Sequence, residues 1–158
     1  MIASAPVPTT ADLQALQGHL AGMPPVAAMG IAVDRFTAGT LFLHAPLEAN
    51  VNDKRNAFGG SLASLMTLAG WGWVNLQLGM AGQTADIYVA DSQLRYLVPV
   101  YETLCAEAAP APGQDWAAFL ATLRQRGKAR LSMAACVRLA SGEIAATFAG
   151  RFVAIAKR

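Results

Sequence analysis

Two hydrophobic periodicities run along this chain, and they predict different elements. Near the N-terminus, leucines at 13, 16 and 20 recur at helical spacing, which predicts a helix over residues 11–21 with Thr10 or Asp12 near its cap. Further on, apolar and polar residues alternate with a period of two, as in half-buried strands. We expect strands at 29–36, 40–46, 84–99, 102–109, 128–140 and 143–156, with turns at 37–39 and 141–142.

The thirty residues from Asn56 to Ala85 contain no Asp, Glu, Lys, Arg or His. A helix over about 57–80 that is apolar on every side either spans a membrane or forms the centre of a core. The core interpretation is favoured because polar side chains interrupt the run, and because Trp71 and Trp73 lie in its middle rather than at its ends. We therefore expect an α+β fold, with an antiparallel sheet wrapped around one long apolar helix.

The remaining segments have weaker patterns. Residues 1–10 are rich in Pro, Ala and Thr and are expected to be frayed, and Pro24-Pro25 are expected to end the first helix. Apolar residues at 116, 119, 120 and 123 predict a short helix that ends near Gly127. We expect residues 1–23 to form an extension with a short helix, and residues 24–158 to form a single domain.

The composition indicates that this chain associates with further copies of itself. Of the 158 residues, 54% are hydrophobic and only 14% are charged, against roughly a quarter charged in ordinary globular chains. A lone small domain cannot bury that much apolar surface, so we expect a homodimer or homotetramer. The net charge of +2 does not favour a nucleic-acid partner.

Cysteines and histidines indicate no cofactor chemistry. Cys105 and Cys136 follow no motif and are expected to be reduced and buried. His19 and His44 lack metal-ligand spacing, so neither a metal nor another cofactor is expected. The N-terminus lacks the basic and long apolar regions of a signal peptide, which predicts a cytoplasmic location.

Candidate chemistry lies where an asparagine-rich loop, 48–56, enters the long helix through Gly59-Gly60. The first turn of a helix has unpaired N–H groups and a partial positive charge. Glycine has no Cβ, so a substrate carbonyl can approach that backbone closely. Asn52 can add an amide donor, and two donors on one oxygen would make an oxyanion or enolate site. Alternatively, the asparagines only form turns or cap the helix, and the glycines only permit tight packing.

The arrangement of these residues resembles the hotdog acyl-thioesterases. Those enzymes typically have Asn, then His-Gly-Gly, then a helix and a strand closing on Tyr-Leu-x-Pro; this chain has Asn52, then Phe58-Gly59-Gly60, and later Tyr96-Leu97-Val98-Pro99. Residues 50–61 are more similar to a putative-thioesterase family that is also found fused behind acetyltransferase domains. That family includes stand-alone hotdog proteins assigned as malonyl-acyl-carrier-protein decarboxylases. The resemblance extends from about Pro24 to the C-terminus and implies a hotdog fold of about five to six strands.

The resemblance also implies roles for individual residues. Asn52 corresponds to the family asparagine, and Gly59 to the glycine whose N–H polarises the thioester carbonyl. Phe58 stands where thioesterases have His, and Thr67 where they have a helix carboxylate. Both departures remove groups that activate water. Together with Gly60 and Ser61, Phe58 and Thr67 are expected to contact the substrate.

Two reactions on a thioester make different demands. Hydrolysis usually needs a base, and Asp91 on the predicted 84–99 strand is the main candidate, although a solvated or salt-bridged role is the alternative. Decarboxylation of a malonyl thioester needs only stabilisation of the enolate. The residues fit malonyl-acyl-carrier-protein decarboxylation best. Hydrolysis of acyl-CoA or acyl-carrier-protein thioesters with Asp91 as base, and a non-catalytic acyl-CoA-binding or scaffold role, stay open.

The substrate carrier is expected to be coenzyme A or a carrier protein's phosphopantetheine. A short basic run at 124–130 includes Arg126 and Lys128. These two side chains are expected to bind the carrier's phosphates. The alternative is that the run is only a solvated helix end and strand edge.

Overall fold

The computed structural model describes residues 6–157; the part of the predicted frayed segment at residues 1–5 lies outside them. Five helical elements occur in the described chain: α1 (Thr10–Ala21), α2 (Pro24–Met29), the 3-10 helix η1 (Leu47–Ala49), α3 (Gly59–Met80) and α4 (Trp116–Arg126). The strands are β1 (Ala32–Thr37), β2 (Thr40–Ala45), β3 (Ala85–Tyr96), β4 (Leu104–Pro110), β5 (Lys128–Arg138) and β6 (Ile144–Ala156).

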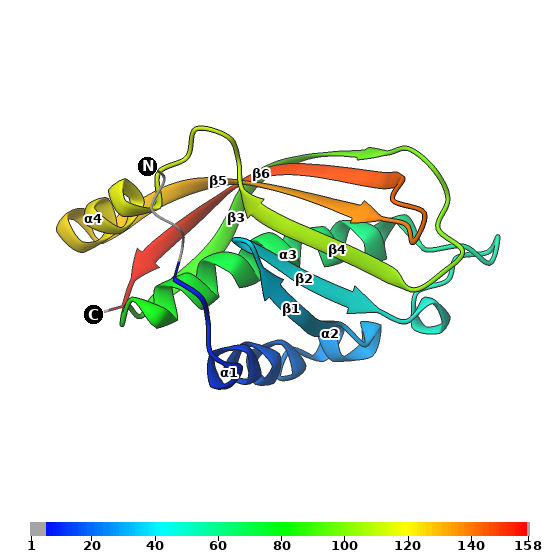
Figure 1. Ribbon diagram of the computed structural model, residues 1–158, viewed down its shortest axis with the longest axis horizontal. Coiled ribbons are helices and arrows are strands. Elements are labelled where there is room, and N and C mark those ends of the chain that lie inside the picture. The colour runs from blue at the N-terminus through cyan, green and yellow to red at the C-terminus, as the bar shows by residue number, and fades with distance from the viewer. Residues whose placement is uncertain (1–5, 158) are drawn as a thin grey trace.

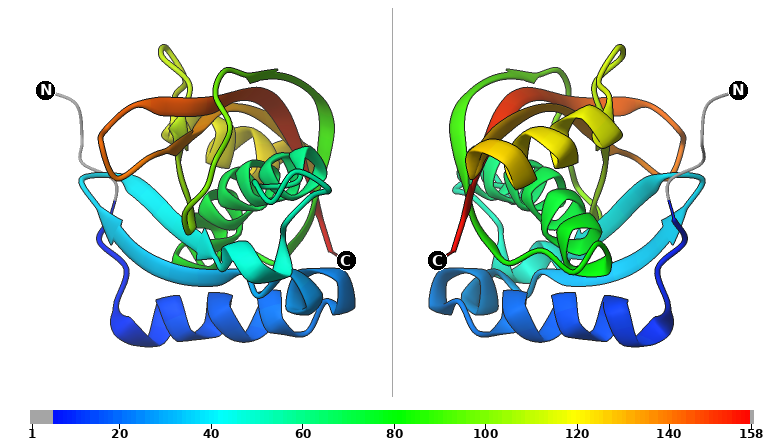
Figure 2. Two further views of the ribbon diagram at one scale, coloured as in Figure 1. Left: turned by 90° about the vertical axis from the view of Figure 1, so that its right-hand side faces the viewer. Right: turned by 90° about the vertical axis from the view of Figure 1, so that its left-hand side faces the viewer.

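The six strands form one antiparallel sheet in the order β1-β2-β4-β5-β6-β3. The sheet curls around α3, with β1 and β3 at its two edges and α1 below β1 (Figures 1 and 2). Alternating residues of β5 and β6 are buried against the helix, as the period of two predicts. The expected α+β architecture, with a hotdog-like sheet around one long helix, is confirmed.

The core lies between α3 and the inner face of the sheet. Twelve of the 22 residues of α3 are buried, so the charge-free run is a core helix. Gly70 is required for this packing, because a Cβ there would lie 2.9 Å from Cε2 of Phe152 on β6. Across residues 6–157, no helix combines the length and hydrophobicity needed to cross a bilayer.

The N-terminal segment differs from the prediction in two places. Thr9, one residue before the expected cap, begins α1 in a capping box: its side chain accepts from the Asp12 amide, and the Asp12 carboxylate accepts from the Thr9 amide. Pro24 does more than end α1, because it begins α2, which extends to Met29. The fixed φ of proline suits the first helical position, so the first strand begins at Ala32 rather than at residue 29.

The two edges of the sheet are covered differently. Leu16 and Leu20 of α1 are buried in the core, and Gln17 Oε1 accepts a hydrogen bond of 2.6 Å from the Val33 amide of edge strand β1. No helix packs along the outer edge of β3 in this way within the described chain (Figure 2). All residues from 88 to 93 of that strand are exposed. An open edge of this kind is a pairing surface.

Candidate active site

The loop before α3 is held in place by buried polar contacts. Asn50 is only 3% exposed, and its Nδ2 donates to the carbonyls of Met29 and Pro46, each at 2.8 Å. Backbone bonds join the end of the loop to its surroundings: the Phe58 amide donates to the Asn50 carbonyl, and the Ala57 amide to the Val100 carbonyl. The loop is therefore a fixed platform beside the first turn of α3.

The orientation of the Asn52 carboxamide follows from its neighbours. Its Oδ1 accepts hydrogen bonds from the amides of Lys54 and Asn56, at 2.8 and 3.2 Å. Because both partners are donors, the oxygen must face them, and Nδ2 must face the other way. Nδ2 donates to Asn56 Oδ1 at 2.6 Å and lies 3.5 Å from the Ala57 carbonyl. One of its two hydrogens thus has only a long, weak contact within the chain.

The start of α3 offers further donors. Phe58 is the N-cap and its side chain makes no capping bond, so Asn56 is not the cap that its position suggested. The amides of Gly59 and Gly60 have no acceptor among the described residues. Tyr96 covers Gly59 from β3: its hydroxyl donates to the Gly59 carbonyl at 3.3 Å, and its ring would lie 3.7 Å from a Cβ at that position.

A cavity of about 380 Å³ brings Asn52 and Gly59 together. Residues from three segments line it: the loop, the first turn of α3 and the end of β3 with the chain after it. They are Asn52, Lys54, Asn56, Ala57, Gly59, Leu62, Tyr96, Leu97, Val98, Pro99 and Val100. This lining contains no carboxylate, histidine or cysteine. The cavity is therefore a largely apolar pocket with amide donors at one wall and no carboxylate, imidazole or thiol to act as a general base.

The other expected substrate contacts do not line this cavity. Phe58 is 54% exposed, and its ring folds over Gly60, where an added Cβ would overlap it. Ser61 is buried, and the Thr67 hydroxyl donates to the Ala63 carbonyl of its own helix at 2.7 Å. Gly60 and Thr67 instead lie on a half-buried side of α3. Contacts of these four residues with a substrate stay a prediction.

Asp91 is not brought to the cavity within one chain. It pairs with Arg151 of β6, whose Nε lies 3.0 Å from Asp91 Oδ1, and both side chains are more than half exposed. The guanidinium of Arg151 holds the pKa of the Asp91 carboxyl below its usual value. A carboxylate with a lowered pKa is a weaker base, so this environment opposes the role of general base that hydrolysis would need.

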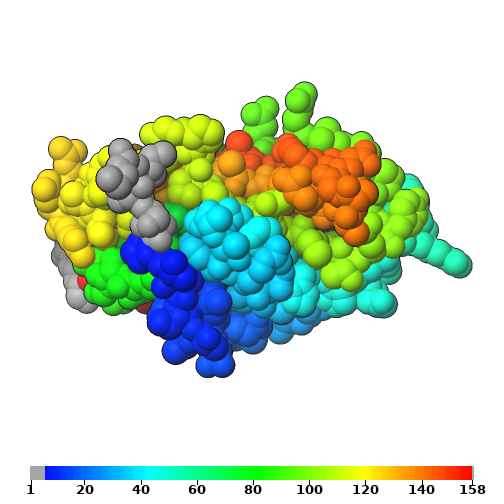
Figure 3. Space-filling view, in the orientation of Figure 1, coloured from blue at the N-terminus to red at the C-terminus, as the bar shows by residue number. Residues whose placement is uncertain are grey.

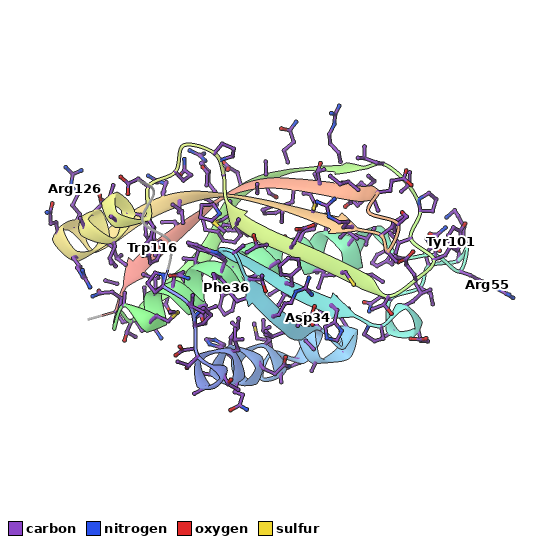
Figure 4. All side chains as sticks on the ribbon, viewed as in Figure 1. Asp34, Phe36, Arg55, Tyr101, Trp116 and Arg126 are labelled. Carbon is purple, nitrogen blue, oxygen red and sulfur yellow. The ribbon has the colours of Figure 1, made fainter. Side chains whose placement is uncertain are left out.

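Within one chain, Arg126 and Lys128 lie far in space from the cavity. The Arg124 guanidinium of α4 donates to the Ala81 carbonyl at the C-terminal end of α3. The cavity is at the N-terminal end of that 22-residue helix, roughly 33 Å away at 1.5 Å per residue. Arg126 and Tyr101 accordingly appear at opposite ends of the molecule (Figure 4). Any phosphate contact from Arg126 or Lys128 to a substrate in this cavity would need a second chain.

The sequence did not predict several of the residues that line the cavity. Tyr96 and the three residues after it were recognised as a motif, yet no role was assigned to them. Leu62 was part of the helix pattern alone, and Lys54 and Asn56 were only loop residues. Tyr96 meets Gly59 across 37 positions in sequence, a contact that local patterns do not encode. The Tyr-Leu-x-Pro motif was the one signal that could have indicated this wall.

Comparisons with known proteins identify a family and similar solved structures. Residues 13–156 match the YiiD_C family, described as "Putative thioesterase (yiiD_Cterm)". A putative thioesterase from Shewanella oneidensis is 32% identical with a TM-score of 0.83, over 93% of this chain and 99% of that one. A protein of unknown function from Chlorobaculum tepidum is 27% identical with a TM-score of 0.85, over 94% and 100% of the two chains.

A more distant structure shares the fold. A thioesterase from Haemophilus influenzae is 17% identical with a TM-score of 0.70, over 97% of this chain and 94% of that one. The family match covers nearly the whole chain, including the asparagine-rich loop, α3 and every strand. The chain belongs to the YiiD_C putative thioesterase family of hotdog proteins.

Proposed function

We propose that this protein decarboxylates malonyl thioesters, with a carrier protein's phosphopantetheine as the leading carrier and coenzyme A as the other. The observation that supports this most is the cavity shared by Asn52 and Gly59, whose lining has amide donors and no carboxylate, histidine or cysteine. Family membership supports the broader assignment to acyl-thioester chemistry.

The reaction needs little from ionisable side chains. The bond between the malonyl carboxylate and the α-carbon breaks, and its electron pair forms the enolate of the thioester as CO₂ leaves. Negative charge collects on the thioester oxygen, where Asn52 Nδ2 and the Gly59 amide donate hydrogen bonds. Water then protonates the α-carbon, and the product is the acetyl thioester. The partial positive charge at the start of α3 adds to the stabilisation.

Hydrolysis fits the cavity less well. It requires a water molecule made nucleophilic by a base. The ionisable groups in the lining are Lys54 and Tyr96, and the lining has no carboxylate, imidazole or thiol to act as that base. The Lys54 ammonium pairs with Asp53 at 2.8 Å at the exposed tip of the loop. The surface view shows this loop protruding at one end of the molecule (Figure 3).

Product analysis separates the candidate functions. The purified protein is incubated with malonyl and acetyl thioesters of coenzyme A and of a carrier protein. We expect CO₂ and an acetyl thioester in equal amounts, with no free thiol. Release of free thiol would instead establish a hydrolase. Thermal stabilisation by the thioesters without turnover would establish the non-catalytic acyl-binding alternative.

Replacement of Asp91 tests the need for a base. Asp91→Asn is expected to leave kcat for decarboxylation within about twofold, because no proton is removed from water in the step that forms the enolate. The matched variant Arg151→Gln removes the other member of the exposed pair and is expected to behave alike. A loss of 10²-fold or more in Asp91→Asn alone would contradict the base-free reaction.

We also propose that two copies associate through β3. This strand is 12 residues long, lies at the sheet edge, and exposes Tyr88 and Val89, at 55% and 43%. The opposite edge is covered by α1, so β3 is the edge whose amides and carbonyls a second copy can pair with. Antiparallel pairing of β3 with itself gives a closed two-fold dimer. It would also extend the sheet and bury part of the large apolar surface that the composition indicates.

A charged substitution on β3 tests this assembly. Val89→Lys places two like charges near the proposed two-fold axis and is expected to convert the dimer to a monomer, measured by sedimentation equilibrium. Ile155→Lys on neighbouring β6 is the control, since Ile155 is 41% exposed but lies one strand inside the edge. A monomeric unmodified protein at micromolar concentration, or an unchanged dimer in Val89→Lys, would contradict the proposal.

A further inference from the structure

We infer that Asn56 is a positioning residue, which acts by fixing the Asn52 carboxamide so that one amide hydrogen faces the cavity. The inference rests on the proposed function, because it concerns the same oxyanion donor. Asn56 is only 8% exposed and belongs to the cavity lining. Its conformation is therefore set by packing and by hydrogen bonds rather than by solvent.

Asn56 and Asn52 are joined by reciprocal bonds. The Asn56 amide donates to Asn52 Oδ1 at 3.2 Å, and Asn52 Nδ2 donates to Asn56 Oδ1 at 2.6 Å. The Asn52 amide also donates to the Asn56 carbonyl at 2.8 Å. Since Asn52 Oδ1 is held by two backbone amides, rotation of the carboxamide by 180° would place its NH₂ group against donors.

Asn56 also has a hydrogen-bond partner outside the loop. Its Nδ2 donates to the hydroxyl of Tyr101 at 3.4 Å, 45 positions along the chain. The orientation of the Asn56 carboxamide follows from Asn52, whose Nδ2 needs an acceptor and so faces Asn56 Oδ1. The Tyr101 hydroxyl can accept as well as donate, so it suits the Asn56 Nδ2 on the other side. The chain of bonds runs from Tyr101 through Asn56 to Asn52. As a result, one Nδ2 hydrogen of Asn52 is bound by Asn56, and the second has only the 3.5 Å contact with the Ala57 carbonyl and is available to a substrate oxygen.

The short bond to Asn56 is the side-chain contact that limits motion of the Nδ2 end. Without an acceptor at position 56, that end of the carboxamide could turn toward the Ala57 carbonyl, now 3.5 Å away. If Nδ2 of Asn52 turns away, the carboxamide has to rotate back before it can donate to the substrate oxygen. Displacement of a catalytic group by about 1 Å can cost as much as 10²-fold in rate.

Two substitutions of similar volume test the inference. Asn56→Leu removes the acceptor and is expected to lower kcat about ten- to a hundredfold, with KM changed by less than about threefold. Asn56→Asp keeps an oxygen beside Asn52 Nδ2 and is expected to recover most of that loss. The melting temperature of each variant is measured alongside, so that a general loss of stability is distinguished from a loss confined to kcat.

A measurement without turnover separates this inference from the proposed function. In the unmodified protein, NMR is expected to show two distinct Asn52 side-chain amide protons, one of them protected from exchange; in Asn56→Leu the protection is lost. Retained protection and kcat in Asn56→Leu, or equal losses of kcat in Asn56→Leu and Asn56→Asp, would overturn the inference. If the unmodified protein is inactive while the NMR result holds, the proposed function fails and the positioning contact stands.

Discussion

Asn52→Asp is expected to lower kcat for malonyl thioester decarboxylation by about 10²- to 10³-fold, the usual effect of removing one oxyanion donor. The aspartate keeps an oxygen for the amides of Lys54 and Asn56, which now bond to Asn52 Oδ1. It replaces Nδ2 with a second oxygen, so the loop is preserved while the donor is lost. Asn56 can reverse its own carboxamide to donate to that oxygen, because the Tyr101 hydroxyl can donate as well as accept.

Steady-state kinetics with thermal unfolding check this prediction. Asn52→Ala is expected to lose a similar factor in kcat but also to loosen the loop, so its melting temperature falls while that of Asn52→Asp stays closer to the unmodified protein. If both variants keep kcat within about twofold, Asn52 has no part in the reaction. The enolate would then need donors from elsewhere.

Trp73→Ala is expected to lower the free energy of unfolding by about 3 to 5 kcal/mol, the range for loss of a large buried aromatic side chain. Trp73 is 1% exposed and connects three parts of the fold. Its Nε1 donates to the Gly39 carbonyl in the β1–β2 turn at 2.9 Å, and its ring meets Trp116 of α4 edge-on with centroids 5.5 Å apart. No small residue can fill the space between α3 and these neighbours.

Urea unfolding of two further variants separates packing from hydrogen bonding. Trp73→Phe keeps an aromatic ring but loses the bond to Gly39 and some ring volume, so about 1 to 2 kcal/mol is expected. Trp116→Ala removes the partner ring, which is only half-buried, and should cost less than Trp73→Ala. A loss below about 1 kcal/mol in Trp73→Ala would show that α3 is not the centre of the core.

Most of the fold followed from two patterns in the sequence. The charge-free run identified α3 because a buried helix tolerates no unpaired charge, and the strict alternation in 128–140 and 143–156 identified β5 and β6. The helix α2 was missed because six residues that begin with two prolines are too short for a hydrophobic period. Met29 was therefore placed in a strand, although it ends α2.

The candidate site was predictable only in part. Asn52 and Gly59 lie close together in sequence, so their meeting at one cavity followed from the loop and helix alone. Tyr96 and Tyr101 come from a distant segment, and the direction of a carboxamide depends on side-chain bonds that no pattern contains. Asp91 had an expected role but not an expected partner, because the register that places Arg151 opposite it belongs to the sheet.

The account depends on a thioester oxygen bound by Asn52 Nδ2 and the Gly59 amide, and a structure of the complex tests this most directly. The ligand is a ketone analogue of the acetyl thioester, in which a methylene group replaces the sulfur so that it cannot be cleaved. We predict a carbonyl oxygen within about 3 Å of both nitrogens. A ligand bound along Phe58 and Thr67 on the other side of α3, with its oxygen beyond about 4 Å from both donors, would contradict the account.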